Sequence, residues 1–418
     1  MEEFDHQKKQ GDVQIGQFKV GLAVGIFITL FVVCVAYLGV QIQQTVENAG
    51  QESQQVNAGG QEGSLGETAA DKIDKLVYMI EHYYYQDNVN REDLEEGIYQ
   101  GLMQAVGDPY TNYFTADEFD AFMEQATGAY YGIGAYVAQD LDRNYPKVNS
   151  PMPGSPAEEA GMRADDIIYE VDGVSTYGMD LDKVVSLIKG EEGTTVKITL
   201  YRKGEYLDVE VQRRQVEIPT VEQEMLEDDM AYIRINEFDE VTPGQFKTAL
   251  EASRDSGMKG LVLDLRGNPG GSVNAVVDIA RMLLPEGLVV YTEDKYGKRE
   301  EYTCDGSNEF KLPLVVLVDG NSASASELLS GAIQDYGKGI LVGTTTFGKG
   351  IVQQMLTLRD GSAIKITISS YFTPKGRNIH KIGIEPDVAC PFDSEAYYTS
   401  GFDNQLEKAR EVLREMME

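Results

Sequence analysis

The stretch LVLDLRGNPGG, residues 261–271, indicates the fold of the larger part of the chain. Its first five residues are mainly apolar and run into a glycine-rich turn, a pattern typical of a strand buried on both faces of a sheet. A second apolar run, LVVLV at 314–318, leads through a polar turn into a helical pattern that ends at Gly337. Because strands and helices alternate in this way from Met230 onward, we predict an α/β core.

The composition excludes several classes of function. The chain has 418 residues, with 36 Lys or Arg against 69 Asp or Glu, and a formal net charge of −33. Nucleic-acid binding and docking on anionic lipid both need clustered positive charge, so we expect neither. Three histidines and three cysteines, without a CxxC pair, argue against a histidine or thiolate metal centre. The length predicts two or three domains.

Residues 20–40 form an uncharged run of 21 residues. As a helix this run would be roughly 30 Å long, close to the thickness of the hydrocarbon layer, so we predict a single transmembrane anchor. A cleaved signal peptide is the alternative, although its apolar region is usually shorter. Three lysines precede the run and the next basic residue is Lys72, so the positive-inside rule places residues 1–19 in the cytoplasm and the rest outside the cell membrane. Cys304 and Cys390 then lie outside, where either a disulfide or two separate thiols fits the sequence.

Two segments follow the predicted anchor. Residues 41–67 are rich in Gln, Glu and Gly and predict a flexible linker. Residues 68–127 predict a helical N-terminal segment, because apolar residues recur at helical spacing from Ile73 to Leu102. We interpret these helices as packing elements. A dimer surface is the alternative, so a homodimer is among the expected partners.

Residues 128–215 alternate short strand patterns with turns. SPAEEAGMRADDIIYEVDG at 155–173 contains a capped short helix, a glycine stop, a strand and a turn. With GIGA at 132–135 opening the first strand, this order resembles a PDZ domain. Members of that family bind the terminal carboxylate of a peptide and add the peptide as an extra strand. The resemblance implies a peptide-binding groove made of Gly132, Ile133, Gly134, Ala135, Val184, Val185 and Ile188. Core packing is the alternative role for the two valines.

A cluster of serines, Ser322, Ser324 and Ser326, lies where a predicted strand meets a predicted helix. Helix N–H groups at such a junction can stabilise an oxyanion, so a serine there is a candidate nucleophile. Ser324 with Glu327 three residues later is also an ordinary capping box, which is the structural alternative.

A nucleophilic serine needs a base, and His82 and His380, the two histidines beyond the predicted anchor, have no motif around them. Lys349 lies between two glycines in a run that is otherwise uncharged from 339 to 358. Burial can lower a lysine pKa from ~10.4 to about 7–8, which would make Lys349 a usable base. Gln353, four residues later, would project to the same face of a strand and hold the amine. A surface lysine in a turn is the alternative.

The chain is similar to the carboxyl-terminal processing (tail-specific) proteases in five motifs: LVLDLRGNPGG, SASASELLSGAIQDYG at 322–337, TFGKGIVQ at 346–353, GDPYTNYF at 107–114 and GIEPDV at 383–388. Members of this family are serine endopeptidases with a serine–lysine dyad and an inserted PDZ domain. The resemblance covers nearly all of residues 71–388. It implies an α/β (α+β) protease core of crotonase-like type at 216–398, followed by a C-terminal helix at 399–418.

The resemblance also implies a role for each motif residue. Ser324 would be the nucleophile, Lys349 the general base, and Gln353 the residue that orients the base. The implied oxyanion hole consists of backbone N–H groups of Gly270, Gly271 and Ala325.

We therefore expect a membrane-anchored serine endopeptidase that cleaves protein substrates near their C-terminus, and the mechanism that the resemblance implies needs no metal, nucleotide or organic cofactor. The PDZ domain would bind the substrate tail and gate the active site. The alternative is a catalytically idle, membrane-tethered PDZ adaptor, although an adaptor has no use for an intact Ser324, Lys349 and Gln353. A phosphate-binding loop at 267–271 is a weaker interpretation, because the GK[ST] ending is missing.

Overall fold

The structure of the protein, a computed structural model, describes residues 67–86 and 89–418. The chain forms two compact units, residues 1–91 and 92–418. In the first unit the structure describes helix α2 (Glu67–Tyr83), as the apolar spacing predicted. The predicted transmembrane run lies outside the described residues. Among the residues that are described, no helix is long and apolar enough to span a membrane.

The second unit begins within helix α3 (Arg91–Gln104) and continues through strand β1 (Asn112–Phe114) and helix α4 (Ala116–Thr127). The helices α3 and α4 both lie in the segment 68–127 that the sequence predicted to be helical, whereas the sequence did not predict β1. Strand β1 pairs antiparallel with β18 (Ala363–Phe372), so the segment expected to be helical also contributes a strand to the core. Helix α4 starts at a capping box and ends at Gly128, whose φ of 68° suits glycine.

The predicted PDZ domain follows α4. Its main sheet is antiparallel, with the order β3-β4-β5-β7-β8 and β6 paired to β5. Strands β2 and β9 pair with each other, Ala129 opposite Glu217, and form a two-stranded neck that leads into and out of the domain. The elements are β2 (Ala129–Gly132), β3 (Ala135–Asp140), β4 (Tyr145–Pro151), α5 (Pro156–Glu159), β5 (Ile167–Val171), β6 (Val174–Ser175), α6 (Leu181–Ile188), β7 (Thr195–Arg202), β8 (Glu205–Gln212) and β9 (Arg214–Glu217).

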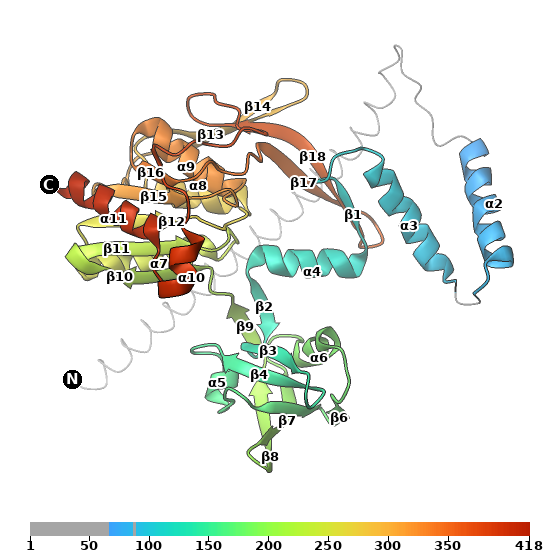
Figure 1. The fold of residues 1–418 in the computed structure, drawn as a ribbon. Coiled ribbons are helices and arrows are strands. Elements are labelled where there is room, and N and C mark those ends of the chain that lie inside the picture. Colours follow the sequence, from blue (N-terminus) through green and yellow to red (C-terminus); the bar gives the residue numbers. More distant parts are fainter. Residues whose placement is uncertain (1–66, 87–88) are drawn as a thin grey trace, which may run out of the picture. The chain divides into compact units, whose positions relative to one another are not determined.

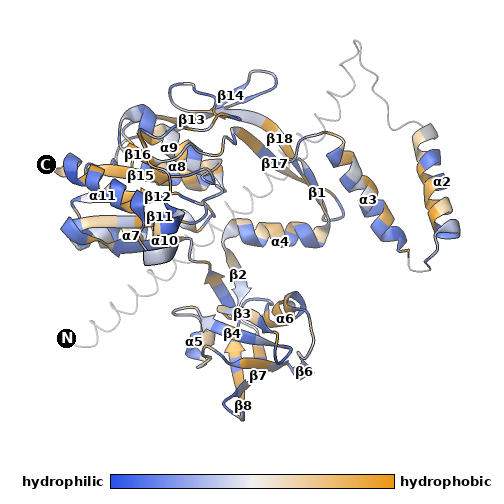
Figure 2. Ribbon diagram, in the orientation of Figure 1, coloured by the Kyte–Doolittle hydropathy of each residue, from blue (hydrophilic) through white to orange (hydrophobic). Residues whose placement is uncertain are grey.

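The core contains a six-stranded sheet in the order β10-β11-β12-β15-β16-β19, parallel except for the edge pair β10–β11 (Figure 1). The strands are β10 (Val221–Met225), β11 (Met230–Ile235), β12 (Gly260–Asp264), β15 (Leu314–Val318), β16 (Ile340–Gly343) and β19 (Val388–Ala389). Every residue of β12 and β15 is buried, as the two apolar runs predicted. Figure 2 shows the contrast between the hydrophobic central strands and the mixed surface helices.

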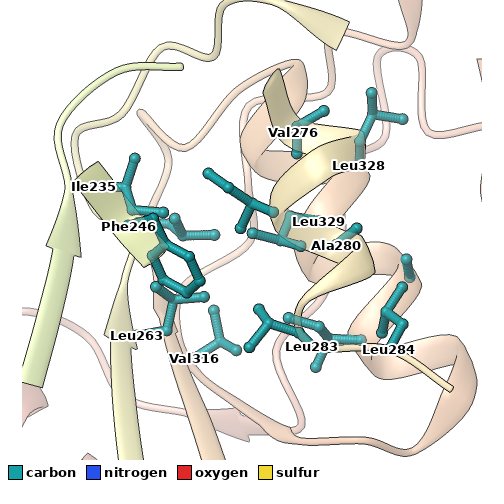
Figure 3. Close-up of a cluster of buried hydrophobic side chains, with 14 of the residues drawn as sticks. Ile235, Phe246, Leu263, Val276, Ala280, Leu283, Leu284, Val316, Leu328 and Leu329 are labelled. Carbon is teal, nitrogen blue, oxygen red and sulfur yellow. The ribbon is translucent and has the colours of Figure 1, made fainter. Parts of the chain in front are cut away.

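Helices cover both faces of this sheet, and the alternation of side chains along β12 shows how. Leu261 and Leu263 pack with helices α7 (Thr242–Asp255), α8 (Val273–Arg281) and α9 (Ala325–Tyr336) in one buried cluster, part of which is drawn in Figure 3. Val262, between them, faces the opposite side and packs with helix α11 (Asn404–Met417). Alternation with both faces apolar is the expected pattern for a central parallel strand. The remaining helices are η1 (Glu227–Asp229) and α10 (Ser394–Ser400).

A second, antiparallel sheet lies beside the first and has the order β1-β18-β13-β14, with β17 also paired to β18. Its remaining strands are β13 (Gly287–Asp294), β14 (Arg299–Cys304) and β17 (Ile351–Thr357). Cys304, the last residue of β14, is buried, and its thiol donates to the Leu284 carbonyl at 3.4 Å. Cys304 and Cys390 are both free thiols, so of the two states that the sequence allowed, the structure has separate thiols.

Candidate active site

A cleft of about 540 Å³ opens between α4, the start of α9 and the second sheet. Ser324, Lys349 and Gln353 all line it, together with Gly271. The structure therefore brings the three residues of the predicted catalytic set to one cavity, although they come from a helix start, a turn and a strand. Their catalytic roles stay a prediction at this point.

The three clustered serines have different surroundings. Ser322 is fully buried and its hydroxyl donates to the Leu265 carbonyl at 2.8 Å. Ser326 is also fully buried and donates to the Asn268 carbonyl at 3.0 Å. Ser324 is partly exposed and is the member of the cluster that lines the cleft. The resemblance implied this serine, and the hydrogen bonds explain why its two neighbours are unavailable.

Ser324 is the N-cap of α9 and has φ 52° and ψ −113°, a conformation that L residues rarely adopt. Such backbone strain costs on the order of 1–3 kcal/mol and persists where surrounding contacts enforce it. The predicted capping box with Glu327 is present. The structural interpretation of Ser324 is thus confirmed, and it does not compete with the catalytic one, because the same residue also faces the cleft.

Glu327 has a larger part in the site than a cap requires. Its carboxylate is fully buried and accepts the backbone N–H of Ser324 at 2.9 Å. It also accepts the Thr346 hydroxyl at 2.6 Å, the Gly348 N–H at 2.7 Å and the Lys349 N–H at 2.8 Å. One carboxylate therefore holds together the turn that carries the serine and the turn that carries the lysine.

Tyr371 supports the same two turns from β18. Its side chain is 1% exposed, and its single hydroxyl proton is shared in a bifurcated hydrogen bond between the carbonyl of Ser324, at 3.1 Å, and the carbonyl of Lys349. Burial raises the pKa of Tyr371 well above its usual value, so the hydroxyl keeps its proton. Glu327 and Tyr371 together fix the backbone on both sides of the cleft.

The Lys349 amine is half-buried and lies over the ring of Tyr110, 4.7 Å from its centroid. Burial, and after it the charge of Lys365, lowers the pKa of Lys349 below the ordinary lysine value. The carboxylates of Asp108 and Glu327 oppose this effect. Within residues 67–86 and 89–418, no hydrogen bond joins the side chains of Ser324 and Lys349, although both line the cleft.

Gln353 is on β17, and its amide nitrogen donates to the Thr367 hydroxyl at 3.3 Å. Thr367 in turn donates to Asp108 at 2.6 Å. Sequence reasoning missed Thr367 and Tyr371, because nothing distinguishes them from other residues of an alternating strand. It also assigned no role to Asp108 and Tyr110, although both belong to the GDPYTNYF motif.

The predicted oxyanion hole needs one correction. Gly270 and Gly271 have φ of 105° and 139°, and a Cβ on Gly270 would lie 2.9 Å from the Ala325 nitrogen, so the turn does lie against the start of α9. The N–H of Gly270, however, donates to the Asn268 side chain at 2.8 Å and is not free for a substrate. Gly271 lines the cleft, and Ala325 is the first residue of α9, where a helix leaves its N–H groups without intrahelical partners.

The predicted peptide groove corresponds to a pocket of about 70 Å³ in the PDZ domain. Gly132, Ile133, Ala135, Val185 and Ile188 line this pocket. The other two predicted groove residues do not. Val184 is 0% exposed in the core of the domain, and Gly134 faces Ser155 and Val216. The pocket is also lined by Lys189, which forms an ion pair with Glu124 of α4.

Acidic side chains form another wall of the cleft. Glu237 and Asp239 follow β11, next to the Gly270–Gly271 turn, where the Phe238 N–H donates to the Gly270 carbonyl at 2.9 Å. Burial, together with the charge of Glu237, raises the pKa of Asp239 to about 7. Within residues 67–86 and 89–418, no group of three or more His, Cys, Asp or Glu could hold a metal ion.

Three stretches of the chain match known protein families. Residues 229–390 match peptidase family S41, residues 147–202 match the PDZ domain, and residues 30–118 match the activating protease CtpB N-terminal domain. The carboxy-terminal processing protease CtpA of Bacillus subtilis (strain 168) is 35% identical over 354 residues, which cover 82% of this chain and 75% of that protein. This chain belongs to the carboxy-terminal processing serine proteases of peptidase family S41.

Other proteins are similar to this S41 protease to a comparable degree. A probable CtpA-like serine protease of Staphylococcus haemolyticus (strain JCSC1435) is 38% identical over 325 residues, 77% of this chain, which spans only 65% of that relative. Among solved structures, the photosystem II D1 C-terminal processing protease is 33% identical, with a TM-score of 0.45, and the match covers 75% of this chain and 86% of the other. The prediction of a carboxyl-terminal processing serine protease with a PDZ domain is confirmed at the level of the family.

Proposed function

We propose that this S41 protease is a membrane-anchored serine endopeptidase that cleaves protein substrates near their C-terminus. Ser324 is the nucleophile and Lys349 is the general base. The observation that carries the proposal is that one serine of three faces the cleft, at a strained helix start, opposite a lysine whose pKa burial lowers. A lowered pKa raises the fraction of neutral amine at physiological pH, and only the neutral amine can take a proton.

The reaction is acyl transfer. Neutral Lys349 takes the hydroxyl proton of Ser324 while the oxygen attacks the scissile carbonyl carbon. The resulting oxyanion accepts hydrogen bonds from the N–H groups of Gly271 and Ala325. The lysine ammonium then returns the proton to the leaving amine as the peptide bond breaks. Water, deprotonated by the same amine, hydrolyses the acyl-enzyme and restores Ser324.

The PDZ domain binds the substrate tail and gates the cleft. Supporting this, Lys189 lines the small PDZ pocket and is paired with Glu124, while the next two residues of α4, Gln125 and Ala126, line the catalytic cleft. Helix α4 thus contacts both sites. A peptide carboxylate entering the pocket meets the ammonium of Lys189 and competes with Glu124 for it.

The membrane anchor is residues 20–40, with the N-terminus in the cytoplasm and the catalytic part outside. The uncharged run and the three lysines before it support this topology. Membrane fractionation of cells, followed by protease treatment of intact spheroplasts, tests it. An external protease should remove the PDZ domain and the core from intact spheroplasts, and protection of both would contradict the topology.

Substitution of the two catalytic residues tests the chemistry. Purified Ser324→Ala and Lys349→Ala should lose cleavage of an unfolded protein with an apolar C-terminal tail by at least about 1,000-fold, because removal of a member of such a catalytic pair leaves little of the rate enhancement. Mass spectrometry of the products should locate the cleavage sites near the C-terminus. Ser307→Ala and Lys311→Ala, at exposed positions of the core, are the matched controls and should cleave like the wild type.

The second candidate function is a PDZ adaptor that binds C-terminal tails without cleaving them. The pocket in the PDZ domain and the missing hydrogen bond between Ser324 and Lys349 favour it as the alternative. Fluorescence anisotropy of a labelled tail peptide measures binding in the same samples. Tail binding by a wild-type protein that cleaves no substrate would support the adaptor and reject the protease.

A further inference from the structure

We propose that Asp108 is a positioning residue of the active site, which acts through Thr367 to fix the orientation of the Gln353 amide. The inference rests on the proposed function, because it concerns how the proposed base Lys349 is held. Asp108 belongs to the segment before the PDZ domain, and Thr367 lies 259 residues further along the chain. The motif GDPYTNYF, which the chemistry had left without a role, thereby becomes part of the catalytic apparatus.

Two consecutive hydrogen bonds connect Gln353 to Asp108 through Thr367. The Gln353 amide nitrogen lies 3.3 Å from the Thr367 hydroxyl oxygen, and this oxygen lies 2.6 Å from a carboxylate oxygen of Asp108. Gln353 and Thr367 are directly opposite each other on the paired strands β17 and β18. The two side chains therefore project from the same face of the sheet, and the Gln353 side chain reaches the cleft.

The Asp108 carboxylate fixes which group donates and which accepts in each of these two hydrogen bonds. An ionised carboxylate only accepts hydrogen bonds, and a threonine hydroxyl has one proton to donate. Because the Thr367 hydroxyl donates its one hydrogen bond to Asp108, it can only accept a hydrogen bond from Gln353. Gln353 must then turn its NH₂ group toward Thr367, which leaves the amide oxygen free as an acceptor for an N–H of Lys349. With the opposite amide orientation, the NH₂ group would face the amine and repel an ammonium.

Asp108 is itself held in the ionised state. Burial acts to raise its pKa, but the hydroxyls of Thr367 and Thr111 and the N–H of Tyr110 donate to the carboxylate, and the net effect lowers the pKa. The titratable groups that face it are His380, which also lowers the pKa of Asp108, and Lys349, whose pKa Asp108 raises in turn. The carboxylate is thus a fixed acceptor at neutral pH.

The same turn supplies the surface on which the Lys349 amine rests. Tyr110 follows Asp108 by two residues, and its ring centroid is 4.7 Å from the Lys349 nitrogen. A cation–π contact favours the ammonium over the neutral amine. Loss of the proton therefore weakens the attraction of the ring, and the neutral amine becomes available to the other groups that line the cleft, Gln353 and Ser324. The turn at 108–111 serves both states of the base.

Thr367→Val and Thr367→Ser test the proposal, because a structural role and a positioning role rank them in opposite order. Valine fills the same volume and favours a strand, whereas serine keeps the hydroxyl and is the poorer strand residue. We expect Thr367→Val to lower kcat by about 10- to 100-fold with KM unchanged, and Thr367→Ser to stay within about threefold of the wild type. Thermal unfolding of the full chain in detergent should show Thr367→Val to be at least as stable as Thr367→Ser.

Asp108→Asn tests whether the donor and acceptor roles in these hydrogen bonds matter. An asparagine NH₂ group donates a hydrogen bond to the Thr367 hydroxyl. This hydroxyl then donates to the Gln353 amide oxygen, so the orientation of the Gln353 amide is reversed. We expect Asp108→Asn to lose kcat to about the same extent as Thr367→Val, and the double variant to lose no more than either. The matched controls are Thr199→Val and Asp208→Asn in the PDZ domain, where the Thr199 hydroxyl donates to the Asp208 carboxylate at 2.8 Å across the paired strands β7 and β8, outside the catalytic cleft. Neither control should change kcat.

The outcomes distinguish a failure of the proposed function from a failure of the positioning role of Asp108 and Thr367. An inert wild type, or full activity of Ser324→Ala in the same assay, would reject the proposed function itself. A wild type that depends on Ser324 and Lys349, combined with a Thr367→Val variant of unchanged kcat, would overturn the positioning inference alone. Equal losses in Thr367→Ser and Thr367→Val would also overturn it, since the hydroxyl would then be irrelevant.

Discussion

At the scale of single residues, the base is tuned by a second lysine. The amine of Lys365 lies over the rings of Phe114 and Phe122, 5.2 Å from each centroid, in the cleft that Lys349 lines. After burial, the charge of Lys365 is the largest cause of the lowered pKa of Lys349. Aromatic rings tolerate an ammonium that burial alone would disfavour, so a cation can be kept close to the base. Burial nevertheless lowers the pKa of Lys365 as well.

Lys365→Met should shift the pH dependence of cleavage toward alkaline pH. Removing the neighbouring charge raises the pKa of Lys349, so a higher pH is needed to obtain the same fraction of neutral amine. We expect the ascending limb of kcat/KM against pH to move up by roughly 0.5–1 unit. Lys295→Met is the matched control, because Lys295 also lies against an aromatic ring, that of Tyr296, but is exposed and does not line the cleft. A limb that moves to lower pH would show that Lys365 does not act through charge.

At the scale of elements, the site depends on a close approach between the turn after β12 and the start of α9. A Cβ on Gly270 would lie 2.8 Å from the Ala323 carbonyl oxygen and 2.8 Å from the Ser324 Cβ. Backbone atoms on both sides leave no flexible side chain to give way. The turn and the helix start are therefore packed so closely that only glycine fits between them.

Gly270→Ala should abolish cleavage and destabilise the core. We expect a loss of activity of more than about 100-fold, because displacing the turn by even 1 Å disorders the oxyanion site. The thermal midpoint of unfolding should also fall, by several degrees or more. Gly154→Ala in the PDZ domain separates the two causes: its φ is 71°, but its added Cβ would meet no atom within 4 Å. That control should lose about 1 kcal/mol of stability and keep full activity. Equal effects of the two substitutions would point to backbone strain alone.

The elements also show how far the sequence can be interpreted. The buried strands 261–265 and 314–318, the helix starting at the serine cluster and the PDZ order were predictable, because each leaves a local pattern of apolar spacing, caps and turns. Strand β1 was not, since three residues carry no periodicity and their pairing with β18 joins positions about 250 residues apart. The Asp108–Thr367 contact could not be predicted for the same reason, since it also joins positions far apart in the sequence. Glu327 was recognised as a cap, but its contacts with Thr346 and Gly348 depend on how two turns meet in space.

At the scale of the whole second unit, the junction between the PDZ neck and the core contains a buried acid. Asp239 is 4% exposed, and its Cβ packs on Gly128, where α4 ends and the neck begins. Its pKa of about 7 lies above the ordinary aspartate value of 3.8 because of burial and, after it, the charge of Glu237. Between these two values the folded state binds more protons than the unfolded state. The free energy of unfolding therefore falls as the pH rises through this window.

Asp239→Asn should remove that dependence. The amide cannot ionise, so the variant should match the wild type near pH 4 and exceed its stability at pH 8. At about 1.4 kcal/mol per unit of pKa, the gain at pH 8 is on the order of a few kcal/mol. Thermal unfolding at pH 4, 6 and 8 measures it. Asp142→Asn, at an exposed turn of the PDZ domain, should change nothing. A variant that gained as much at pH 4 as at pH 8 would indicate a packing effect in place of the charge.

The paired neck has a consequence for the modularity of the molecule. Since Ala129 and Glu217 stand opposite each other on neighbouring strands, the chain leaves the core and returns to it at almost the same point. For the core, the inserted domain is then comparable to the tip of a long hairpin. A foreign recognition module whose two ends are equally close can be grafted there without moving β10 or α4. Natural exchange of such modules therefore requires little change in the backbone of the core. The same holds for the design of proteases with new tail specificities.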